Sequence, residues 1–446
     1  MRFERVLKQR HVLALAFGAM IGWSWVLLSG LWIARAGTVG AALAFLVAGG
    51  AMIFIALTYA ELAAAMPETG GEHVYTERAF GRGLSFVCTW ALLLGYVSVV
   101  AFEVVALPFA LSYLWPALNV GLLWQVAGWD VYASQVALGV SGAVALTLVN
   151  LRGLAAAASL QGFVTLVIVI SGVLLATGAL RQGTSANLQP LFVDGWRGVF
   201  GVLVMVPLMF VGFDVIPQAA EEIDLPPARI GAVMIVAVAC GIAWYVAIIL
   251  AVGYVLPGPA RASAELATAD AASLGWSGTW AGTLLVGGGV AGIITTWNAF
   301  LVGASRLTYV LAAAGLLPGW LAPRAHGAPN LAPALWAICA LSCLAPWFGR
   351  PALVWLVDAG SLGVIVAYAL VALAFVRLRQ HQPDLPRPYR VPGGVACGWL
   401  AFGLSLLLAA LYLPPSPSAL VWPQEWILCG AWAAAGIALY RRAAGT

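Results

Sequence analysis

The chain has 446 residues, of which 63% are hydrophobic and only 9% are charged. Ordinary soluble domains are about 45–50% apolar and about 25% charged, so this composition excludes a soluble globular protein. The formal net charge is +4 and no long basic tract is present, so nucleic-acid binding is not expected.

Hydropathy predicts an all-α polytopic membrane protein with about twelve transmembrane helices. At ~20 apolar residues per crossing, twelve crossings need roughly 240 residues and leave the remainder for loops and tails. The predicted crossings are 12–34, 40–65, 84–115, 134–150, 158–180, 198–222, 230–256, 281–312, 332–348, 353–376, 396–413 and 424–440. The first apolar run is too long for a cleavable signal peptide. No linker interrupts the chain, so residues 1–446 are predicted to form a single transmembrane domain.

The distribution of Lys and Arg predicts the orientation. With a cytoplasmic N-terminus, sixteen of the 21 Lys and Arg residues lie on the cytoplasmic side. The five on the outer side are Arg35, Arg181, Arg197, Arg261 and Arg350. Because cytoplasmic loops are enriched in Lys and Arg, we expect a multi-pass protein of the cytoplasmic (inner) membrane with both termini in the cytoplasm.

Two crossings contain residues that interrupt a helix at mid-depth. The first crossing has Gly18 and Gly22, followed by Ser24, whose hydroxyl can bond to freed backbone groups. The sixth crossing has Gly212 and Pro217; a proline in a helix lacks the N–H and clashes with the carbonyl four residues earlier. Broken backbone at this depth persists only where it lines a cavity or is buried in protein.

The two predicted breaks lie five helices apart, so their helices cross the membrane in opposite directions. This arrangement is typical of a 5+5 inverted repeat with a substrate site at the midplane. The predicted halves are about 12–180 and 198–376, with additional helices at about 396–440. Freed N–H groups suit a carboxylate and freed carbonyls suit an ammonium group, so a zwitterion fits the gap. Ordinary packing kinks are the alternative.

Five motifs, taken in order, resemble the amino acid-polyamine-organocation (APC) superfamily of transporters. They are GAMIG at 18–22, YAELA at 59–63 with the segment through 81, FVGFD at 210–214, SR at 305–306 with AGLLP at 314–318, and the segment 368–392. No single motif is decisive, but their order and spacing make the resemblance strong.

The resemblance implies a leucine-transporter-type fold with broken helices 1 and 6. It implies a secondary active transporter, or permease, that moves a small amino acid by alternating access, with proton symport or exchange. The chain is not expected to be an enzyme. Carried over position by position, the resemblance predicts as substrate-binding residues Ala19, Met20, Ile21, Gly22, Trp23, Ser24, Phe210, Val211, Gly212, Phe213, Asp214, Trp297 and Phe300.

Two positions depart from the family pattern. Family members commonly have Gly-Ser/Thr-Gly at the first break, where this chain has Gly22, Trp23 and Ser24, followed by Trp25. The two indoles either crowd the pocket or point away into helix packing. Some proton-coupled relatives have a lysine in the fifth helix, and the matching position here is Ile168. A coupled proton is therefore expected on a carboxylate, and exchange without a coupled ion is equally compatible.

Carboxylates in apolar runs are candidate functional groups because an ionisable group is costly at depth. Glu103 is predicted to be a proton or ammonium site, and Asp214 to carry a proton, receive an amine, gate the site or cap a half-helix. Glu61 and Asp358 are expected to be structural. The acidic loop 68–77 is expected to be a solvated cytoplasmic connection.

No cofactor is expected, and the coupling ion is expected to be a proton. Sodium is less favoured, although Thr295, Thr296 and Asn298 lie where sodium-coupled proteins of this fold place ligands, because helical Thr usually bonds its own helix. No nucleophile with a base, metal cluster or phosphate-binding loop is present, so neither catalysis nor a metal site is predicted. The expected partners are an amino acid or amine and the lipid bilayer, and the chain is expected to be a monomer or homodimer.

Two rival functions remain open. An organic-amine or polyamine carrier needs carboxylates at the site, which Glu103 and Asp214 supply. A transport-defective sensor or interaction subunit would accumulate no substrate.

Overall fold

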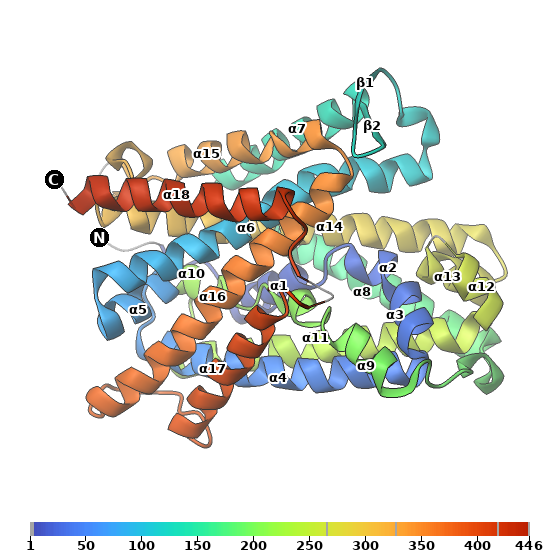
Figure 1. Ribbon diagram of the computed structural model, residues 1–446, viewed down its shortest axis with the longest axis horizontal. Coiled ribbons are helices and arrows are strands. Elements are labelled where there is room, and N and C mark those ends of the chain that lie inside the picture. The colour runs from blue at the N-terminus through green and yellow to red at the C-terminus, as the bar shows by residue number, and fades with distance from the viewer. Residues whose placement is uncertain (1–3, 265, 326–327, 417–418, 445–446) are drawn as a thin grey trace.

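The computed structural model describes residues 4–264, 266–325, 328–416 and 419–444. Helices make up most of these residues, and many of them run side by side along the long axis of the molecule (Figure 1). The only strands in the described ranges form two small antiparallel hairpins. They pair β1 (Leu122–Val126) with β2 (Trp129–Tyr132) and β3 (Arg324–Ala325) with β4 (Ala328–Pro329).

Eight segments of the described chain are long and apolar enough to cross a membrane. They are α4 (Thr38–Ala65), α6 (Arg82–Leu114), α7 (Ala133–Leu151), α8 (Leu154–Gln182), the interrupted segment Gly195–Gln218, α11 (Pro227–Val255), α14 (Thr279–Ala313) and α16 (Pro351–His381). Further helices lie at the remaining predicted crossings: α1 to α3 within residues 9–36, α15 (Ala332–Ser342) with η6 (Ala345–Phe348), α17 (Val395–Ala410) and α18 (Gln424–Ala444). The all-α polytopic fold is therefore confirmed.

The first and sixth crossings are both interrupted, as predicted. The first consists of α1 (Gln9–Met20), α2 (Ser24–Leu27) and α3 (Ser29–Ala36), and the sixth of α9 (Gly195–Leu203), η3 (Pro207–Phe210), α10 (Val215–Gln218) and η4 (Ala220–Glu222). The first gap is shorter than expected, because Ala19 and Met20 are still helical and Ser24 already begins α2. In the second gap Gly212 has φ +131°, a conformation that favours glycine.

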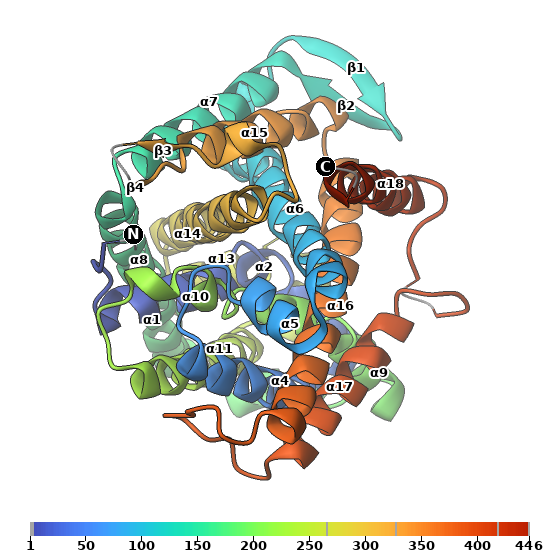
Figure 2. The same ribbon diagram turned by 90° about the vertical axis from the view of Figure 1, so that its left-hand side faces the viewer.

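Shorter helices connect the crossings. They are α5 (Glu72–Phe80), η1 (Pro116–Leu118), η2 (Ser185–Leu188), α12 (Gly258–Ser263), α13 (Ala267–Gly275) and η5 (Gly319–Leu321). Figure 2 looks onto the end of the bundle that carries the N-terminus, where α5 and α10 lie near the centre.

Helix α14 lies at the centre of the bundle. Its apolar window is 83% buried, against 39% for α7 and for α8. Small residues let its backbone approach the first break, because a Cβ on Gly292 would overlap the carbonyl oxygen of Gly22. Close backbone approach at glycine is the usual basis of helix packing in membranes, where burial of apolar surface gives little driving force.

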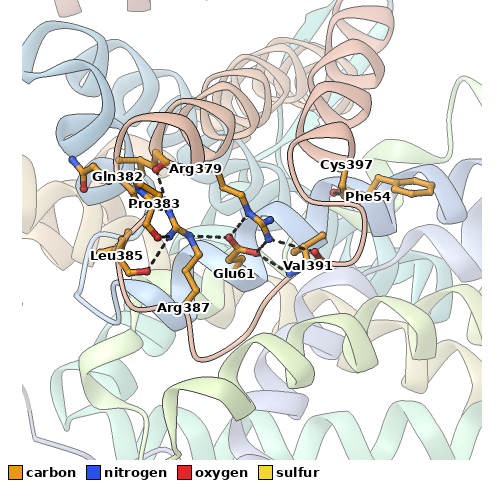
Figure 3. A network of polar contacts seen from close by, with 10 residues as sticks. Phe54, Glu61, Arg379, Gln382, Pro383, Leu385, Arg387, Val391 and Cys397 are labelled. Atoms are coloured by element: carbon orange, nitrogen blue, oxygen red, sulfur yellow. Dashed lines mark hydrogen bonds and ion pairs between the residues drawn. The ribbon is translucent and has the colours of Figure 1, made fainter.

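A buried ion-pair network fastens α16 and the loop after it to α4 (Figure 3). Glu61 on α4 accepts from Arg379 on α16, with Nε at 2.8 Å, and forms an ion pair with Arg387 at 3.1 Å. The backbone N–H of Val391 donates to the same carboxylate at 2.8 Å. Glu61 is therefore a structural anchor, as its position at the helix end predicted.

Candidate functional site

The first break is held open from two neighbouring helices. The Tyr245 hydroxyl on α11 donates to the carbonyl of Met20 at 2.9 Å and lies 3.2 Å from the Ser24 hydroxyl. On α14, Thr296 Oγ1 lies 3.2 Å from the carbonyl oxygen of Gly18. Side-chain hydroxyl groups of the protein thus already donate to backbone carbonyls that were expected to bind the ammonium group of the substrate. The N–H groups of Gly22 and Trp23 donate to no acceptor among the described residues.

Glu103 on α6 points its carboxyl group at this break. A Cβ built on Gly22 would lie 3.6 Å from Glu103 Oε1 and 3.0 Å from Thr296 Oγ1. The side chain is 2% exposed, and its Oε2 has no hydrogen-bond partner within the described ranges. Lys, Arg and His form no ion pair with it in that part of the chain. The structure therefore places a buried, unpartnered carboxyl beside the first break.

Asp214 lies in the second break and is fully buried. Its carboxylate accepts from the Tyr96 hydroxyl at 2.7 Å, the Tyr368 hydroxyl at 3.0 Å and the N–H of Gly212 at 2.8 Å. Although Asp214 immediately precedes α10, its side chain makes no capping hydrogen bond to that helix. The carboxylate instead joins α6 and α16 to the broken sixth crossing.

The two breaks contact each other. A Cβ on Gly212 would lie 2.7 Å from the Cβ of Ala19 and 2.9 Å from its carbonyl carbon. Real Cβ atoms essentially never come within 3.0 Å of another heavy atom, so this approach requires glycine. The broken segments of the first and sixth crossings thus meet at Ala19 and Gly212, which defines one region within the bundle.

Aromatic side chains surround this region. Phe213 packs against Tyr59 and Tyr368 with ring centroids 5.5 and 5.6 Å apart. Phe300 lies 5.0 Å from Tyr96, and Phe210 lies 5.8 Å from Tyr245. Each of these rings is fully or almost fully buried, so in this conformation the region is closed to solvent.

The structure places three other predicted site residues, Trp297, Val211 and Ile21, in different surroundings. The Trp297 ring lies against Gly142 on α7, where a Cβ would come within 3.1 Å of it. Val211 lines a small cavity together with Tyr368. Ile21, in the first gap itself, is fully buried.

The two indoles that depart from the family pattern pack between helices. The ring of Trp23 fills the space above Gly289 on α14. Trp25 makes an edge-to-face contact with Trp244 on α11, with ring centroids 5.3 Å apart. Of the two alternatives that the sequence left open, the structure therefore favours helix packing.

The polar side chains considered for sodium are engaged in hydrogen bonds within the protein. Thr295 Oγ1 donates to the carbonyl of Gly292 at 2.9 Å. The Asn298 amide donates to Gln161 on α8 at 2.9 Å and accepts from Asn150 on α7 at 2.9 Å. The two contacts of Asn298 tie α14 to α8 and α7.

The family model for amino acid permeases matches residues 7–435. The chain belongs to the amino acid permease family. It is 27% identical to the branched-chain amino acid permease BcaP of Bacillus subtilis (strain 168), over 91% of this chain and 87% of that protein. It is 25% identical to the lysine-specific permease LysP of Escherichia coli (strain K12), over 84% and 79%. It is 24% identical to the aspartate-proton symporter of Bacillus subtilis (strain 168), over 90% and 78%.

The family assignment confirms the resemblance to APC transporters. This permease is a multi-pass membrane protein and an amino acid transporter, and its family is a transporter family rather than an enzyme family. The comparisons do not favour the organic-amine carrier or the sensor. The relatives' names cover neutral, cationic and acidic substrates, so the family alone does not select among them.

Glu72 is a buried acid of the permease that the sequence did not reveal. Glu72 begins α5 in the acidic loop that was expected to be solvated, yet its side chain is fully buried. That expectation was wrong because Gly70 and Gly71, with φ of +100° and +34°, turn the chain inward. The paired glycines immediately before Glu72 were the available signal. Gln218 on α10 donates to Glu72 Oε2.

Proposed function

We propose that this permease is a secondary active transporter that carries a small neutral amino acid together with a proton across the cytoplasmic (inner) membrane. The observation that carries the proposal is the buried carboxyl of Glu103 beside Gly22, with Oε2 unpartnered in the described chain. The substrate site comprises the predicted residues of the first and sixth crossings other than Trp23, whose ring packs against Gly289. The alternating conformations arise because both crossings are already divided into separate half-helices.

The charges at the breaks support a neutral substrate. Glu103 and Asp214 are acids, and the described residues include no Lys or Arg that forms an ion pair with either. An acidic substrate would therefore meet the negative charge of Asp214, and that of Glu103 once it has released its proton, in a medium of low dielectric constant. A zwitterion presents its ammonium group toward Glu103 and its carboxylate toward the unpaired N–H groups of Gly22 and Trp23.

Proton coupling follows from the isolation of Glu103. An ionised carboxylate without a counter-charge is unfavourable in the membrane interior, so in this closed conformation we expect Glu103 to hold a proton. Opening of the first break to water on the cytoplasmic side hydrates the carboxyl group and allows it to release that proton. Asp214 already accepts three hydrogen bonds and is assigned to closing the site rather than to carrying the proton.

The orientation and assembly are proposed from the sequence and the contacts. The excess of Lys and Arg places both termini in the cytoplasm. At that end the bundle is closed by the ion pair of Arg306 with Glu222 at 2.7 Å, and by Leu7 N–H donating to Glu222 O at 2.9 Å. The proposed site is assembled within one chain, and we propose that a monomer suffices for transport.

Uptake into proteoliposomes tests the substrate class. Radiolabelled alanine, leucine, lysine and aspartate are compared, with spermidine as a polyamine. We expect accumulation of a neutral amino acid and little uptake of aspartate. Uptake restricted to lysine or spermidine would make Glu103 an ammonium site and overturn the neutral assignment. Flat uptake of every compound would favour a sensor or interaction subunit.

The coupling role is tested with Glu103→Gln and an imposed pH gradient. The variant is expected to lose gradient-driven accumulation while keeping exchange of labelled for unlabelled substrate, because exchange requires no release of the proton. Glu68→Gln is the matched control, since Glu68 is an exposed acid. Intact gradient-driven uptake in Glu103→Gln would remove this residue from coupling. If substrate uptake by the wild-type protein does not depend on the pH gradient, the transport mode is exchange instead of symport.

A further inference from the structure

The start of α5 packs against α10, which follows the second break, and against α14. A Cβ on Gly71 would lie 2.6 Å from the Cβ of Pro217 on α10, and one on Gly70 would lie 3.0 Å from the side chain of Val310 on α14. Glycine at both positions lets the loop approach these helices closely. Glu72, the next residue, begins α5 and is fully buried. Helix α5 lies at the end of the bundle that carries the N-terminus (Figure 2).

The contacts of Glu72 are polar but incomplete. Its Oε2 accepts from the Gln218 side chain, whose Nε2 is also 3.4 Å from the backbone carbonyl of Asp214. Glu72 Oε1 and Gln218 Oε1 are both buried and have no hydrogen-bond partner among the described residues. One amide group therefore bridges a buried acid on α5 to the backbone of the second break.

No positive charge compensates Glu72 in the part of the chain that the structure describes. The titratable groups that interact with it electrostatically are Tyr59 on α4, Tyr75 on α5, Cys88 and Tyr96 on α6, Asp214 before α10, and Tyr368 on α16. From α14, Arg306 is engaged by Glu222 at 2.7 Å. His73 on α5 pairs with Glu77, with 3.7 Å between Nε2 and Oε2.

These surroundings favour the neutral form of Glu72. Burial raises the pKa of the Glu72 carboxyl well above its ordinary value, and the charge of Asp214 raises it further, while hydrogen bonds from its own backbone and from Gln218 oppose the shift. An acid whose pKa is raised by docking stabilises the docked state at low pH. That stabilisation is lost as the pH rises from the ordinary carboxyl pKa toward the raised one.

We propose that Glu72 is a proton-binding site that controls the cytoplasmic gate of the permease. The neutral carboxyl docks α5 against α10 and closes that side, and loss of its proton releases α5. This inference rests on the orientation given under Proposed function. Closing takes one proton from the cytoplasm and opening returns it to the same side, so the site carries no proton across the membrane and is separate from coupling at Glu103.

The broken sixth crossing allows this contact to act as a gate. Four residues, 211–214, separate η3 from α10, so α10 is able to move with α5 without bending a continuous helix. Gln218, which docks Glu72, also contacts the backbone of Asp214, whose carboxylate binds Tyr96 and Tyr368. Release of α5 therefore withdraws support from the closed side of the substrate site.

Hydrogen exchange of the substrate-free protein in lipid nanodiscs tests the proposal. Protection factors are measured for peptides covering residues 66–80 at about pH 6 and about pH 8, after correction for intrinsic exchange. We expect wild-type protection to fall with rising pH, by up to about tenfold per pH unit for one linked proton. Glu72→Gln, which keeps the shape but cannot ionise, should stay protected at both values. The exposed-site control Glu68→Gln should behave as wild type.

The direction of the effect distinguishes Glu72 from its neighbour. Burial lowers the pKa of His73, so protonation of that ring would loosen α5 as the pH falls, which is the opposite trend. Equal wild-type protection at both pH values, or the same pH dependence in Glu72→Gln, would overturn the proposal.

A second variant keeps the test independent of Glu72→Gln. Gln218→Leu removes the donor to Glu72 and should lower protection of residues 66–80 at both pH values; unchanged protection would also count against the gate. Because the readout uses neither substrate nor transport, its failure is separate from a failure of the uptake experiments.

Discussion

Close contact between α14 and the first break should make Gly292 intolerant of any side chain. A Cβ there would lie 2.9 Å from the carbonyl carbon of Gly22 and 3.0 Å from the carbonyl oxygen of Ile21, and nearer still to the oxygen of Gly22. Ordinary contact begins at 3.4 Å. All three atoms belong to the backbone, so no flexible side chain can move aside. In Gly292→Ala, α14 and the break must separate by about 1 Å, and overpacking of this kind costs about 1–3 kcal/mol.

The cost should appear mainly in transport, because the strain falls on the break that binds substrate. Since 1.4 kcal/mol corresponds to a tenfold change in affinity, substrate binding should weaken by roughly 5- to 150-fold. The apparent KM for uptake into proteoliposomes and the thermal unfolding midpoint report the two effects.

Gly287→Ala provides a matched control on the same helix, because a Cβ at Gly287 meets no atom within 4 Å. It should leave uptake unchanged and raise helix stability by up to about 1 kcal/mol. Equal uptake by the two variants would refute the reasoning, as it would show that the backbone of α14 does not shape the break.

Three further substitutions probe the surrounding contacts. Glu61→Gln removes the negative partner of Arg379 and Arg387. Denaturation in detergent should show that the free energy of unfolding falls by about 3 kcal/mol, the low end for a broken buried pair, because the Arg379 side chain is 20% exposed. Tyr245→Phe leaves the Met20 carbonyl without its 2.9 Å donor; we expect a loss of about 1–3 kcal/mol and a raised KM, and an unchanged KM would show that this hydroxyl does not position the break. Tyr368→Phe removes one of three donors to Asp214 and should lower the unfolding midpoint by the equivalent of about 1 kcal/mol, which a midpoint equal to wild type would contradict.

Backbone chemistry explains why the breaks were predictable from sequence. Paired glycines and a proline act on their own helix, so their effect is local and is visible in the chain. The gap at Val211, Gly212 and Phe213 agrees with the prediction. The first gap is shorter than predicted because Thr296 and Tyr245, from other helices, satisfy carbonyls at the end of α1 and keep its last turn helical.

The orientation of side chains was not predictable in the same way. Trp23 and Trp25 left two possibilities open until α14 and α11 were in place to receive their rings. The proximity of Glu103 to Gly22 depends on how α6 crosses α1, which neither helix encodes alone. The depth of Asp214 was predictable from sequence, but the tyrosines of α6 and α16 that bind it were not.

The sequence by itself determined the class of protein, the approximate limits of its long apolar helices, its family and the places where two helices break. Each of these depends on composition, on runs of apolar residues or on local backbone chemistry. Only the tertiary structure decided which charged groups meet the breaks. Glu72 shows the difference, because an acid in a polar loop appears solvated in sequence, and it becomes a buried group only when two glycines allow the loop to pack against α10 and α14. Burial depends on neighbours distant in the chain, so the electrostatics of the site are a property of the packed bundle.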